Sequence, residues 1–594
     1  MQSILSNRSN VKMKTIPEAF FETAEVFPQK NALLYKREGV YFPITYKELS
    51  QNVKILSNSF KKLGINKGDK IAILSENRPE WVISDLSIMF IGAVSVPLHT
   101  TFSSKAISNI LNHSRAKILV VSNGDLLNKV LLLHQNLKHL KKIIFLEKLT
   151  GIEKQTLNIK KYNLKGKIFH WKTILNHNEK EFCEKIFLDP NEICTIIYTS
   201  GTTGNPKGVP LSHKNILSNV EATNEVVPVK EKDVFLSFLP LSHILERTAG
   251  YYVPILHGAT IAYAENIKQM SYNLKEIAPT ILVSVPRIFE KFHDAIWDKI
   301  NNLSSFKKKL FAWSLRQKEK TIGHSIANFL FFRNIRKKLG GKIRLAISGG
   351  ASLNKNLARF FLKIGILVIE GYGLTETSPV ISANKENDFK FGTVGKIIPG
   401  VKVKISDKKE ILVNGPNVFQ GYFKDKKSTK LSFDKNGWFR TGDLGFIDQQ
   451  GFLTIIGREK EMFVLSGGKN IWPEPIENLL NNDKFIAQSI IIGNKKKFVS
   501  TLIIPDWQEI KMYLKNNDLL LQEHYKLIKN PVILSVFQDR IDKKINPHLS
   551  DFEKIKKFKL LPSEFSQEND ELTPTLKLRR HIIEKHYKKE IESL

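Results

Sequence analysis

Short apolar runs alternate with amphipathic stretches along the first 150 residues of the chain. The apolar runs have the length of strands, as in KIAILSE, VSVPL and KILVVSN. The stretches between them place apolar residues three or four positions apart, as in YKELSQNVKILSNSFKKLG, which ends at Gly64. This alternation is typical of βαβ units with buried, largely parallel strands. It predicts an α/β fold that begins with a short strand pair over residues 30–46.

The pattern changes at several places farther along the chain. Residues 150–185 are polar and irregular, and we expect a surface excursion there. Residues 299–340 interrupt the alternation with two helix-like, basic and aromatic stretches. From residue 392 short β-segments and turns predict a small distorted β-barrel, and the remainder alternates strands with basic helices. The interpretation is an N-terminal domain over 1–457, with its barrel part at 392–457, followed by a small α+β domain over 458–594.

Composition narrows the function classes only slightly. The chain has 594 residues, 42% of them hydrophobic, two cysteines and a formal net charge of +33. Such a charge attracts anions, including nucleotides, anionic lipid and nucleic acid, but the lysines are spread along the chain and no nucleic-acid module is recognisable. Two cysteines suggest neither a disulfide framework nor a zinc site. Without a secretory signal or a membrane span, we expect a cytoplasmic protein, with a peripheral position on the inner face of the membrane as an alternative.

The richest chemistry lies in residues 198–209, YTSGTTGNPKGV. An apolar strand, ICTIIYT, leads into this stretch, and a helix with Ser212 as its N-cap follows it. Glycines let backbone N–H groups face an anion, hydroxyls donate further hydrogen bonds and a lysine neutralises charge. The composition therefore predicts a polyphosphate loop, although the spacing is not that of a Walker motif. Its predicted ligand residues are Thr199, Ser200, Gly201, Thr202, Thr203, Gly204 and Lys207.

Two later strands also end in glycine-rich turns, IRLAISGGASL (343–353) and ILVIEGYGLTETSP (366–379). Two such turns at the ends of neighbouring strands can enclose a flat ligand. Gly349, Gly350, Gly371 and Gly373 let the backbone approach it, and the ring of Tyr372 can stack on a base. Thr375 is expected near the phosphates, and Glu376, with Thr199, is a candidate Mg²⁺ ligand.

The string YTSGTTGNPKGV resembles the phosphate-loop signature of the adenylate-forming superfamily, which contains acyl-CoA synthetases, luciferase-like enzymes and adenylation domains of peptide synthetases. GYGLTET is similar to the family's adenine-binding motif. LPLSHILER, SVPRIFEKF and TPTLKLRR look like long-chain fatty acyl-CoA synthetases. The resemblance covers about residues 30–585, with at least five motifs in order. It implies two α/β subdomains and a barrel, followed by a mobile C-terminal domain.

The resemblance also implies residue roles. Asp443, in WFRTGDLG, would bind the ribose hydroxyls, and Arg458 would contact ribose or phosphate. Lys460 would be the hinge of a domain rotation. Gly467, Gly468 and Lys469 would line a pantetheine tunnel, and His243 would face the acyl substrate, although a lone histidine is more often a satisfied core residue. Lys577 matches the mobile catalytic lysine, with Leu576 where the commoner form of the motif has glycine.

The implied reaction activates a long-chain fatty acid with ATP and Mg²⁺ to acyl-AMP and then transfers the acyl group to CoA. An acyl-carrier-protein ligase remains the alternative, since the first half-reaction is shared. A peptide-synthetase adenylation domain is less favoured, because no carrier domain follows within the 594 residues. A non-enzymatic binding protein on a retired scaffold is the third reading. Acyl chain length and oligomeric state, monomer or homodimer, stay open.

The stretch 299–340 has two interpretations. Its Lys and Arg residues, with Phe311, Trp313, Phe329, Phe331 and Phe332 among them, could lie on an anionic membrane. The commoner case is a helical insertion that packs its aromatic residues on the body of the protein.

Overall fold

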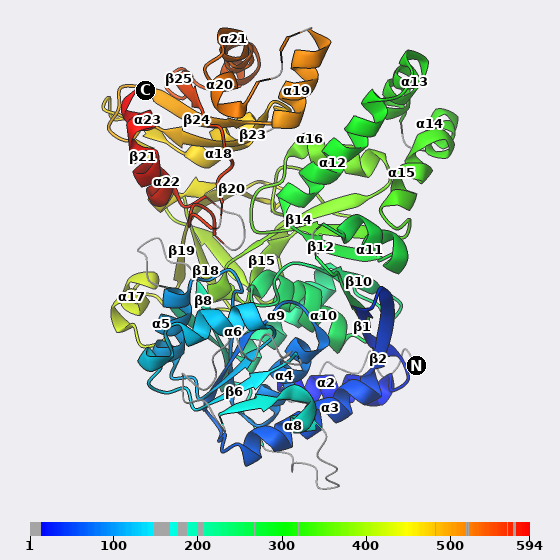
Figure 1. Cartoon of the computed structure of the whole chain (residues 1–594), viewed down its shortest axis with the longest axis vertical. Helices are drawn as coiled ribbons and strands as arrows, with labels where there is room; N and C mark the ends of the chain where they lie inside the picture. Colours follow the sequence, from blue (N-terminus) through cyan, green and yellow to red (C-terminus); the bar gives the residue numbers. More distant parts are fainter. Residues whose placement is uncertain are drawn as a thin grey trace. The chain divides into compact units, whose positions relative to one another are not determined.

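The computed structural model describes residues 14–147, 167–175, 187–199, 206–266, 268–318, 320–481, 483–517, 519–520, 522–566, 568–573 and 578–594. By packing, the chain divides into two compact units (Figure 1). The larger comprises Met1–Val403, Val413–Phe439 and Gly451–Leu453. The smaller comprises Lys404–Leu412, Arg440–Gln450 and Thr454–Leu594. The domain boundary predicted at residue 457 stays a prediction, since the two units interleave between residues 403 and 454.

The first sheet of the larger unit has nine strands in the order β16-β15-β14-β13-β12-β10-β11-β1-β2. Its central strands, from β14 to β1, are parallel, and antiparallel partners close both ends. The strands are β1 Asn31–Arg37, β2 Val40–Thr45, β10 Val234–Ser237, β11 Thr260–Tyr263, β12 Ile281–Ser284, β13 Leu345–Ser348, β14 Leu367–Gly373, β15 Val380–Ala383 and β16 Lys396–Ile397.

The second sheet of this unit has seven strands in the order β7-β6-β5-β3-β4-β8-β9. All pairs are parallel except β8 with β9, which forms an antiparallel edge. The strands are β3 Lys70–Leu74, β4 Val94–Leu98, β5 Ile118–Val121, β6 Lys142–Phe145, β7 Ile168–His170, β8 Ile193–Thr199 and β9 Lys207–Ser212. Most residues of strands β3 to β6 are apolar and buried, because both faces of the sheet are covered there.

Helices cover the sheets and fill the space between them. They are α2 Ile16–Val26, α3 Tyr46–Lys62, α4 Pro79–Phe90, α5 Ser104–Ser114, α6 Gly124–Leu131, α8 Trp171–Leu175, α9 His213–Val226, α10 Val253–Leu256, α11 Met270–Ile277, α12 Pro286–Asn301, α13 Ser305–Arg316, α14 Ile322–Ala327, α15 Arg333–Lys338, α16 Lys355–Lys363 and α17 Lys426–Ser432, with π-helical turns Glu246–Tyr252 and Asn328–Phe332. One continuous core joins both sheets through α4, α9 and α10.

Local sequence explains where these helices begin and end. The hydroxyl of Thr45 caps α3 by accepting from the backbone N–H of Glu48, and the carboxylate of Glu48 accepts in turn from the backbone N–H of Thr45. Ser212 caps α9 in the same way with Asn215, as predicted. Gly64 follows the end of α3 with φ of 82°, a left-handed conformation that glycine adopts without strain.

The smaller unit is an α+β structure. Its sheets are the open β17-β18-β19-β20, the pair β21-β22, and β23-β24-β25. The strands are β17 Lys402–Ile405, β18 Glu410–Asn414, β19 Phe439–Ile447, β20 Leu453–Arg458, β21 Phe463–Val464, β22 Asn470–Ile471, β23 Ile486–Ile492, β24 Val499–Pro505 and β25 Ile555–Leu560. The helices are α18 Pro473–Asn481, α19 Trp507–Asn516, α20 His524–Leu527, α21 Pro531–Arg540, α22 Arg580–His586 and α23 Lys588–Glu592.

The predicted fold class is therefore confirmed: two α/β subdomains, a β-rich part and a small α+β part. The β-rich part is a half-barrel, because β15 and β16 extend the edge of the nine-stranded sheet and β17–β20 do not close on themselves. The expectation of irregular structure over 150–185 is wrong for residues 167–175, which form β7 and α8. Among the described residues, every helix falls short of the length and apolarity that crossing a bilayer requires.

The stretch 299–340 folds as the end of α12 followed by α13, α14 and α15. Phe311 and Phe332 are fully buried on the body of the protein, with Trp297 and Phe331 packed around Phe311. Phe329, in contrast, is 72% exposed. The packing interpretation therefore holds for one face of this stretch only.

Candidate active site

The predicted phosphate loop connects two strands of a hairpin. Thr199, the last residue of β8, pairs in register with Lys207, the first residue of β9. Sequence reasoning expected the helix to follow the loop directly and missed β9. The predicted ligands Ser200, Gly201, Thr202, Thr203 and Gly204 lie outside the described residues, so the structure fixes only the two ends of the loop.

Lys207 and Glu376 converge on the side chain of Tyr422. The ammonium of Lys207 lies 4.9 Å from the centre of the tyrosine ring and donates to the hydroxyl of Ser428 at 2.8 Å. The hydroxyl of Tyr422 donates to Oε1 of Glu376 at 2.8 Å. Burial, and then the charge of Glu376, raises the pKa of Tyr422 well above its usual value, so the phenol keeps its proton. A cation and an anion from distant parts of the chain are thus held beside one ring.

The backbone around this cluster leaves little free space. A side chain at Gly208 would meet Ile196 at 3.0 Å and Phe423 at 3.2 Å. The carbonyl of Gly208 accepts from the N–H of Phe423 at 2.9 Å. Glycine at this position therefore lets the stretch that carries Tyr422 approach β9.

The two glycine-rich turns come from neighbouring strands, as expected. β13 and β14 pair in parallel, with Ser348 opposite Glu370. The N–H of Gly349 donates to the carbonyl of Ser284 at 3.1 Å, and Gly350 has φ of 85°. Both turns therefore lie at the carboxyl ends of adjacent parallel strands, where α/β sheets place ligands.

The second of these turns is tightly folded. A Cβ at Gly373 would lie 1.8 Å from the carbonyl oxygen of Pro379, so only glycine fits. Gly371 and Tyr372 lie in β14 opposite Ala383 and Ser382 of β15. Thr375 and Glu376 follow in a 3-10 turn, Thr375–Thr377, and the carbonyl of Glu376 accepts from the N–H of Phe419 at 2.9 Å.

The oxygen atoms of this region suit a hard cation. Thr199 pairs in register with Lys207, and both Lys207 and Glu376 contact the side chain of Tyr422. Lys207 therefore links the two predicted metal ligands, Thr199 and Glu376. Among the described residues no group of three or more His, Cys, Asp or Glu side chains could hold a metal ion. A carboxylate and a hydroxyl fit Mg²⁺, which commonly binds through one or two protein oxygens with phosphate and water completing its shell.

His243 lies where the two sheets of the larger unit meet. It follows β10 of the nine-stranded sheet, and its Nδ1 accepts from the N–H of Leu245 at 3.3 Å. Its neighbour Ser242 contacts Nδ1 of His99 at 2.7 Å, and His99 follows β4 of the seven-stranded sheet. The rings of His99 and His243 lie 6.3 Å apart. Burial, and then the nearby His243, lowers the pKa of His99 to about 3, so His99 is neutral at physiological pH.

Two ionisable residues in the segment that follows His243, Glu246 and Arg247, are buried. The guanidinium of Arg247 forms an ion pair with Asp85, which also accepts from the hydroxyl of Tyr252 at 2.8 Å. Burial opposes the charge of Arg247, but Asp85 keeps its pKa above the usual value. Burial raises the pKa of Glu246 to about 8, partly offset by a hydrogen bond from Ser237. Nη1 of Arg247 also donates to the hydroxyl of Thr195 in β8 at 2.7 Å, and Ser237 belongs to β10, so this part of LPLSHILER joins the two sheets.

In the smaller unit, the residues predicted to bind ribose contact one another. Nε of Arg458, at the end of β20, lies 2.9 Å from Oδ1 of Asp443 in β19. Asp443 is nearly buried, with 4% of its side chain exposed, whereas Arg458 is 39% exposed. The pair can present a carboxylate and a cation together, which suits a ribose phosphate.

The remaining predicted residues are exposed or outside the described part of the chain. Lys460 is exposed in the 3-10 turn Glu459–Glu461. Gly467 and Gly468 form the turn between β21 and β22, where Gly468 has φ of 77°, and Lys469 lies over the ring of Phe552 at 5.7 Å. Lys577 lies outside the described residues.

Sequence reasoning missed Tyr422, Ser428 and His99. Tyr422 and Ser428 stand in a stretch predicted as plain barrel, more than 200 residues from Lys207, and nothing local signals the contact. His99 gave a weak signal, because a polar residue at the end of the apolar strand VSVPL marks a candidate site.

Solved structures of low sequence identity share this fold. A crystal structure of the anthranilate CoA ligase AuaEII in complex with anthranoyl-AMP aligns with a TM-score of 0.76 at 19% identity, covering 98% of each chain. The adenylation domain of a carboxylate reductase from Mycobacterium chelonae aligns with a TM-score of 0.81 at 19% identity, covering 100% of this chain and 92% of that one. The fold is thus that of the adenylate-forming enzymes.

Sequence comparison gives the family. The model of the AMP-binding enzyme family matches residues 20–423, and that of the AMP-binding enzyme C-terminal domain matches 460–594. The chain belongs to the AMP-binding enzyme family. It is 32% identical to the long-chain-fatty-acid–CoA ligase FadD15 of Mycobacterium bovis, over 95% of this chain and 94% of the relative. It is 31% identical to the long-chain-fatty-acid–CoA ligase ACSBG2 of Xenopus laevis, over 98% and 83%.

Proposed function

We propose that this protein is an ATP-dependent ligase that activates a long-chain fatty acid to acyl-AMP and transfers the acyl group to CoA, releasing AMP and pyrophosphate. Membership of the AMP-binding enzyme family and similarity to long-chain-fatty-acid–CoA ligases support the reaction class. The observation that carries the proposal is the convergence of Lys207, at one end of the predicted phosphate loop, and Glu376 on Tyr422.

The first step must bring two anions together, a carboxylate and the α-phosphate of ATP. Lys207 holds a positive charge beside the loop, because Ser428 and the ring of Tyr422 fix its ammonium. Such a fixed cation stabilises charge that develops on transferring phosphate without reorganising during the reaction. Lys577 supplies the second cation in this proposal, a role that comes from the resemblance of TPTLKLRR.

Glu376 and Thr199 are the residues that would hold Mg²⁺. The bound ion would neutralise the β- and γ-phosphates and ease the departure of pyrophosphate. Tyr422 donates to one oxygen of Glu376, so the other oxygen can face the ion. Gly349, Gly350, Gly371, Tyr372 and Gly373 would bind adenine, Thr375 the phosphates, and Asp443 with Arg458 the ribose.

The acid is expected on the side of His243. Ser242 contacts neutral His99 at the end of β4, and within the segment the N–H of Leu245 donates to Nδ1 of His243. For the second step, the resemblance assigns Lys460 to a hinge and Gly467, Gly468 and Lys469 to the path of the pantetheine arm. Exclusion of water between the steps would protect the mixed anhydride.

The direct test is ATP–pyrophosphate exchange across a panel of fatty acids from short to very long. We expect acid-dependent exchange with a maximum among long chains, then thioester formation when CoA is added. Transfer to acyl-carrier protein in place of CoA would select the alternative ligase. Absence of exchange with every acid would refute adenylate formation and leave a non-enzymatic role.

A further inference from the structure

The stretch 299–340 presents two different faces. One face is part of the hydrophobic core, through Phe311, Ala327 and Phe332, all fully buried. Nζ of Lys363 on α16 donates to the carbonyl of Gln317, and Arg336 donates to the carbonyl of Ile364 at 2.6 Å. These contacts fix the helices to the body, so the opposite face is held in a defined position.

That opposite face is apolar to an unusual degree for a surface. Its exposed side chains come from α13, α14 and the π-helical turn Asn328–Phe332. They are Phe306 at 75%, Trp313 at 38%, Ile322 at 83%, Ile326 at 46%, Phe329 at 72% and Leu330 at 39% exposure. The three elements pack against one another, and large exposed apolar side chains gathered on adjoining elements mark a contact surface rather than ordinary surface. We call these six residues the apolar tip.

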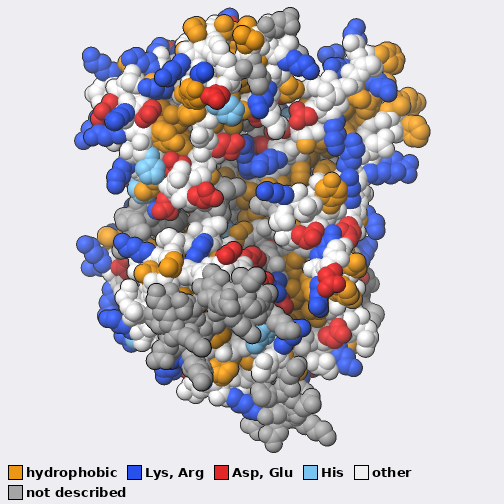
Figure 2. All heavy atoms as spheres, viewed as in Figure 1, with side chains coloured by type: hydrophobic (Ala, Val, Ile, Leu, Met, Phe, Trp, Pro, Cys, Tyr) orange, Lys and Arg blue, Asp and Glu red, His pale blue; other side chains and the backbone are white. Residues whose placement is uncertain are grey.

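Positive charge surrounds the apolar tip. Residues 299–340 contain eleven Lys or Arg and a single acidic residue, Glu319. Lys307, Lys308 and Lys309 are exposed on α13, and none of them forms an ion pair with another described residue. The pKa of Lys338 is lowered first by burial and then by the nearby charges of Lys299 and Lys275. Figure 2 shows orange and blue side chains together over the projecting helices α13 and α14 of Figure 1.

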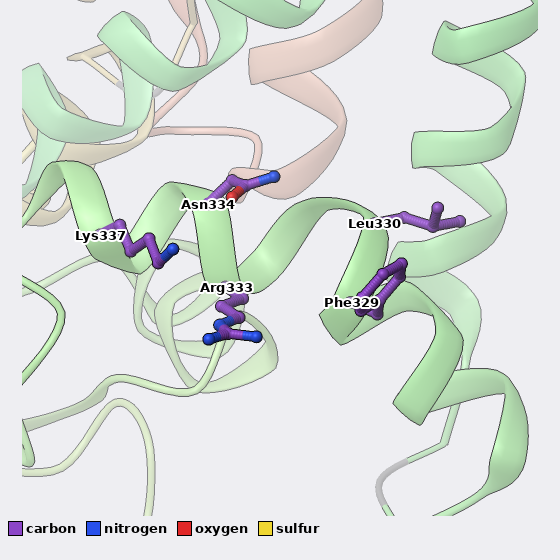
Figure 3. A pocket seen from close by; sticks show the side chains of 5 residues that line it. All are labelled: Phe329, Leu330, Arg333, Asn334 and Lys337. Atoms are coloured by element: carbon purple, nitrogen blue, oxygen red, sulfur yellow. The ribbon is translucent and has the colours of Figure 1, made fainter.

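A pocket of about 350 Å³ joins the two features. Phe329, Leu330, Arg333, Asn334 and Lys337 line it, with Arg333 and Lys337 on successive turns of α15 (Figure 3). Arg336, between them in sequence, is hydrogen-bonded to Asn328 and Ile364 instead. Two exposed cations beside an aromatic and an aliphatic side chain can bind a phosphate with its attached hydrocarbon.

We propose that the apolar tip and the pocket at Arg333 and Lys337 dock on the surface of a bilayer that contains anionic phospholipid. Interfacial helices combine aromatic and aliphatic side chains with flanking Lys and Arg, as this stretch does. Charge complementarity selects the occupant: the cations meet lipid phosphates while the apolar tip enters the acyl boundary. A second copy of this chain would bring the same positive charge to the contact.

The test is flotation of the full-length protein with vesicles, without ATP, acid or CoA. Two kinds of vesicle are compared: phosphatidylcholine with roughly 30% phosphatidylglycerol, which has a strongly negative surface, and pure phosphatidylcholine. We expect binding to the anionic vesicles only, falling as salt rises. Arg333→Gln with Lys337→Gln should weaken binding by roughly 30-fold, since each basic residue near the surface contributes about fivefold. Phe329→Ser with Ile322→Ser should abolish flotation.

Matched controls separate the surface from general charge and hydrophobicity. Lys47→Gln with Lys61→Gln removes two exposed lysines of α3, and Leu132→Ser with Leu520→Ser removes two exposed leucines elsewhere. Both control pairs should float as the unchanged protein does. Exchange activity with a short, soluble acid should stay unchanged in all four variants, which shows that each is folded.

Three outcomes would overturn the proposal: no flotation of the unchanged protein, equal flotation with neutral vesicles, or unchanged flotation of the Arg333–Lys337 variant. Tight binding of a single-stranded oligonucleotide that depends on Arg333 and Lys337, without flotation, would replace the bilayer with nucleic acid. Because vesicle binding is read without ATP, its failure leaves the proposed ligase function intact, and the reverse also holds.

Discussion

Positively charged side chains differ between the interior around the two large sheets and the stretch 299–340. Neighbouring groups fix them in the interior, whereas they are exposed in the stretch 299–340. Lys207 is fixed by the hydroxyl of Ser428 and the ring of Tyr422, and Arg247 is paired with buried Asp85. Lys307, Lys308 and Lys309 are exposed, without an ion pair among the described residues. A fixed cation can stabilise one charge at one position, whereas loose cations suit a diffuse anionic surface. Because the chain has a net charge of +33, its lysine content alone does not show which cations are fixed in the interior and which are exposed to a surface.

The largest difference is expected in stability. Among the described residues, Arg247→Leu leaves the buried carboxylate of Asp85 with the hydroxyl of Tyr252 as its donor, and removing one member of a buried ion pair costs about 3–5 kcal/mol. We expect urea unfolding to show this loss. Lys309→Leu on α13 is the matched control, since a surface cation changes stability by less than about 0.5 kcal/mol. Similar losses in both variants would remove the distinction between the two regions.

The next effect is on catalysis. Glu376→Gln keeps the shape of the side chain but removes the negative charge that would hold Mg²⁺. We expect the rate of acid-dependent pyrophosphate exchange to fall about 100-fold, with unfolding and vesicle flotation unchanged. Glu225→Gln, on the exposed face of α9, serves as the control. Normal exchange in Glu376→Gln at low Mg²⁺ would exclude Glu376 as the ligand.

The parts of the structure that could be predicted are those whose sequence signal is local, and the parts that were missed depend on contacts between distant residues. Alternating apolar runs gave the parallel strands, because burial on both faces leaves a local pattern that needs no knowledge of partners. The cap at Ser212 and the neighbouring turns at Gly349 and Gly371 followed from equally local signals. The hairpin strand β9 was missed because it contains Gly208 and Pro210, which read as loop. Pro210 is tolerated there because β9 is the edge of its sheet.

Residues of the candidate site could be predicted only where a chemically suitable residue stands beside the end of a strand. This condition holds for Thr199, Lys207, Gly349 and Glu376. Tyr422, which holds Lys207 and Glu376 together, does not, since its role depends on contacts with residues distant in sequence. Likewise, sequence periodicity identified 299–340 as amphipathic and aromatic. It did not separate Phe332, which is buried, from Phe329, which is exposed, because that separation depends on which side chains of this turn meet the core of the larger unit.

A smaller effect concerns pH and the buried carboxyl of Glu246. Its pKa is raised to about 8 in the folded protein, from an ordinary value of 4.5. The folded state therefore holds a proton that the unfolded state releases, so stability is full below pH 4.5 and is lost as pH rises toward 8. Glu246→Gln should flatten this loss by about 2 kcal/mol between roughly pH 6.5 and pH 8.5 in urea unfolding. The exposed Glu225→Gln should follow the unchanged protein, and parallel curves for both variants would mean that Glu246 does not titrate in this range.

The smallest effect tests how the fixed charges are held in place. Tyr422→Phe removes the hydroxyl that donates to Glu376 but keeps the ring beside Lys207. One hydrogen bond to a carboxylate contributes about 1–2 kcal/mol, so exchange should slow by about 5- to 30-fold. As a positioning residue, Tyr422 should also raise the Mg²⁺ concentration that gives half-maximal rate, and Tyr272→Phe on an exposed tyrosine should change neither quantity. A slower rate with an unaltered Mg²⁺ dependence would mean that Tyr422 acts through Lys207 or the fold, and that Glu376 keeps its position without it.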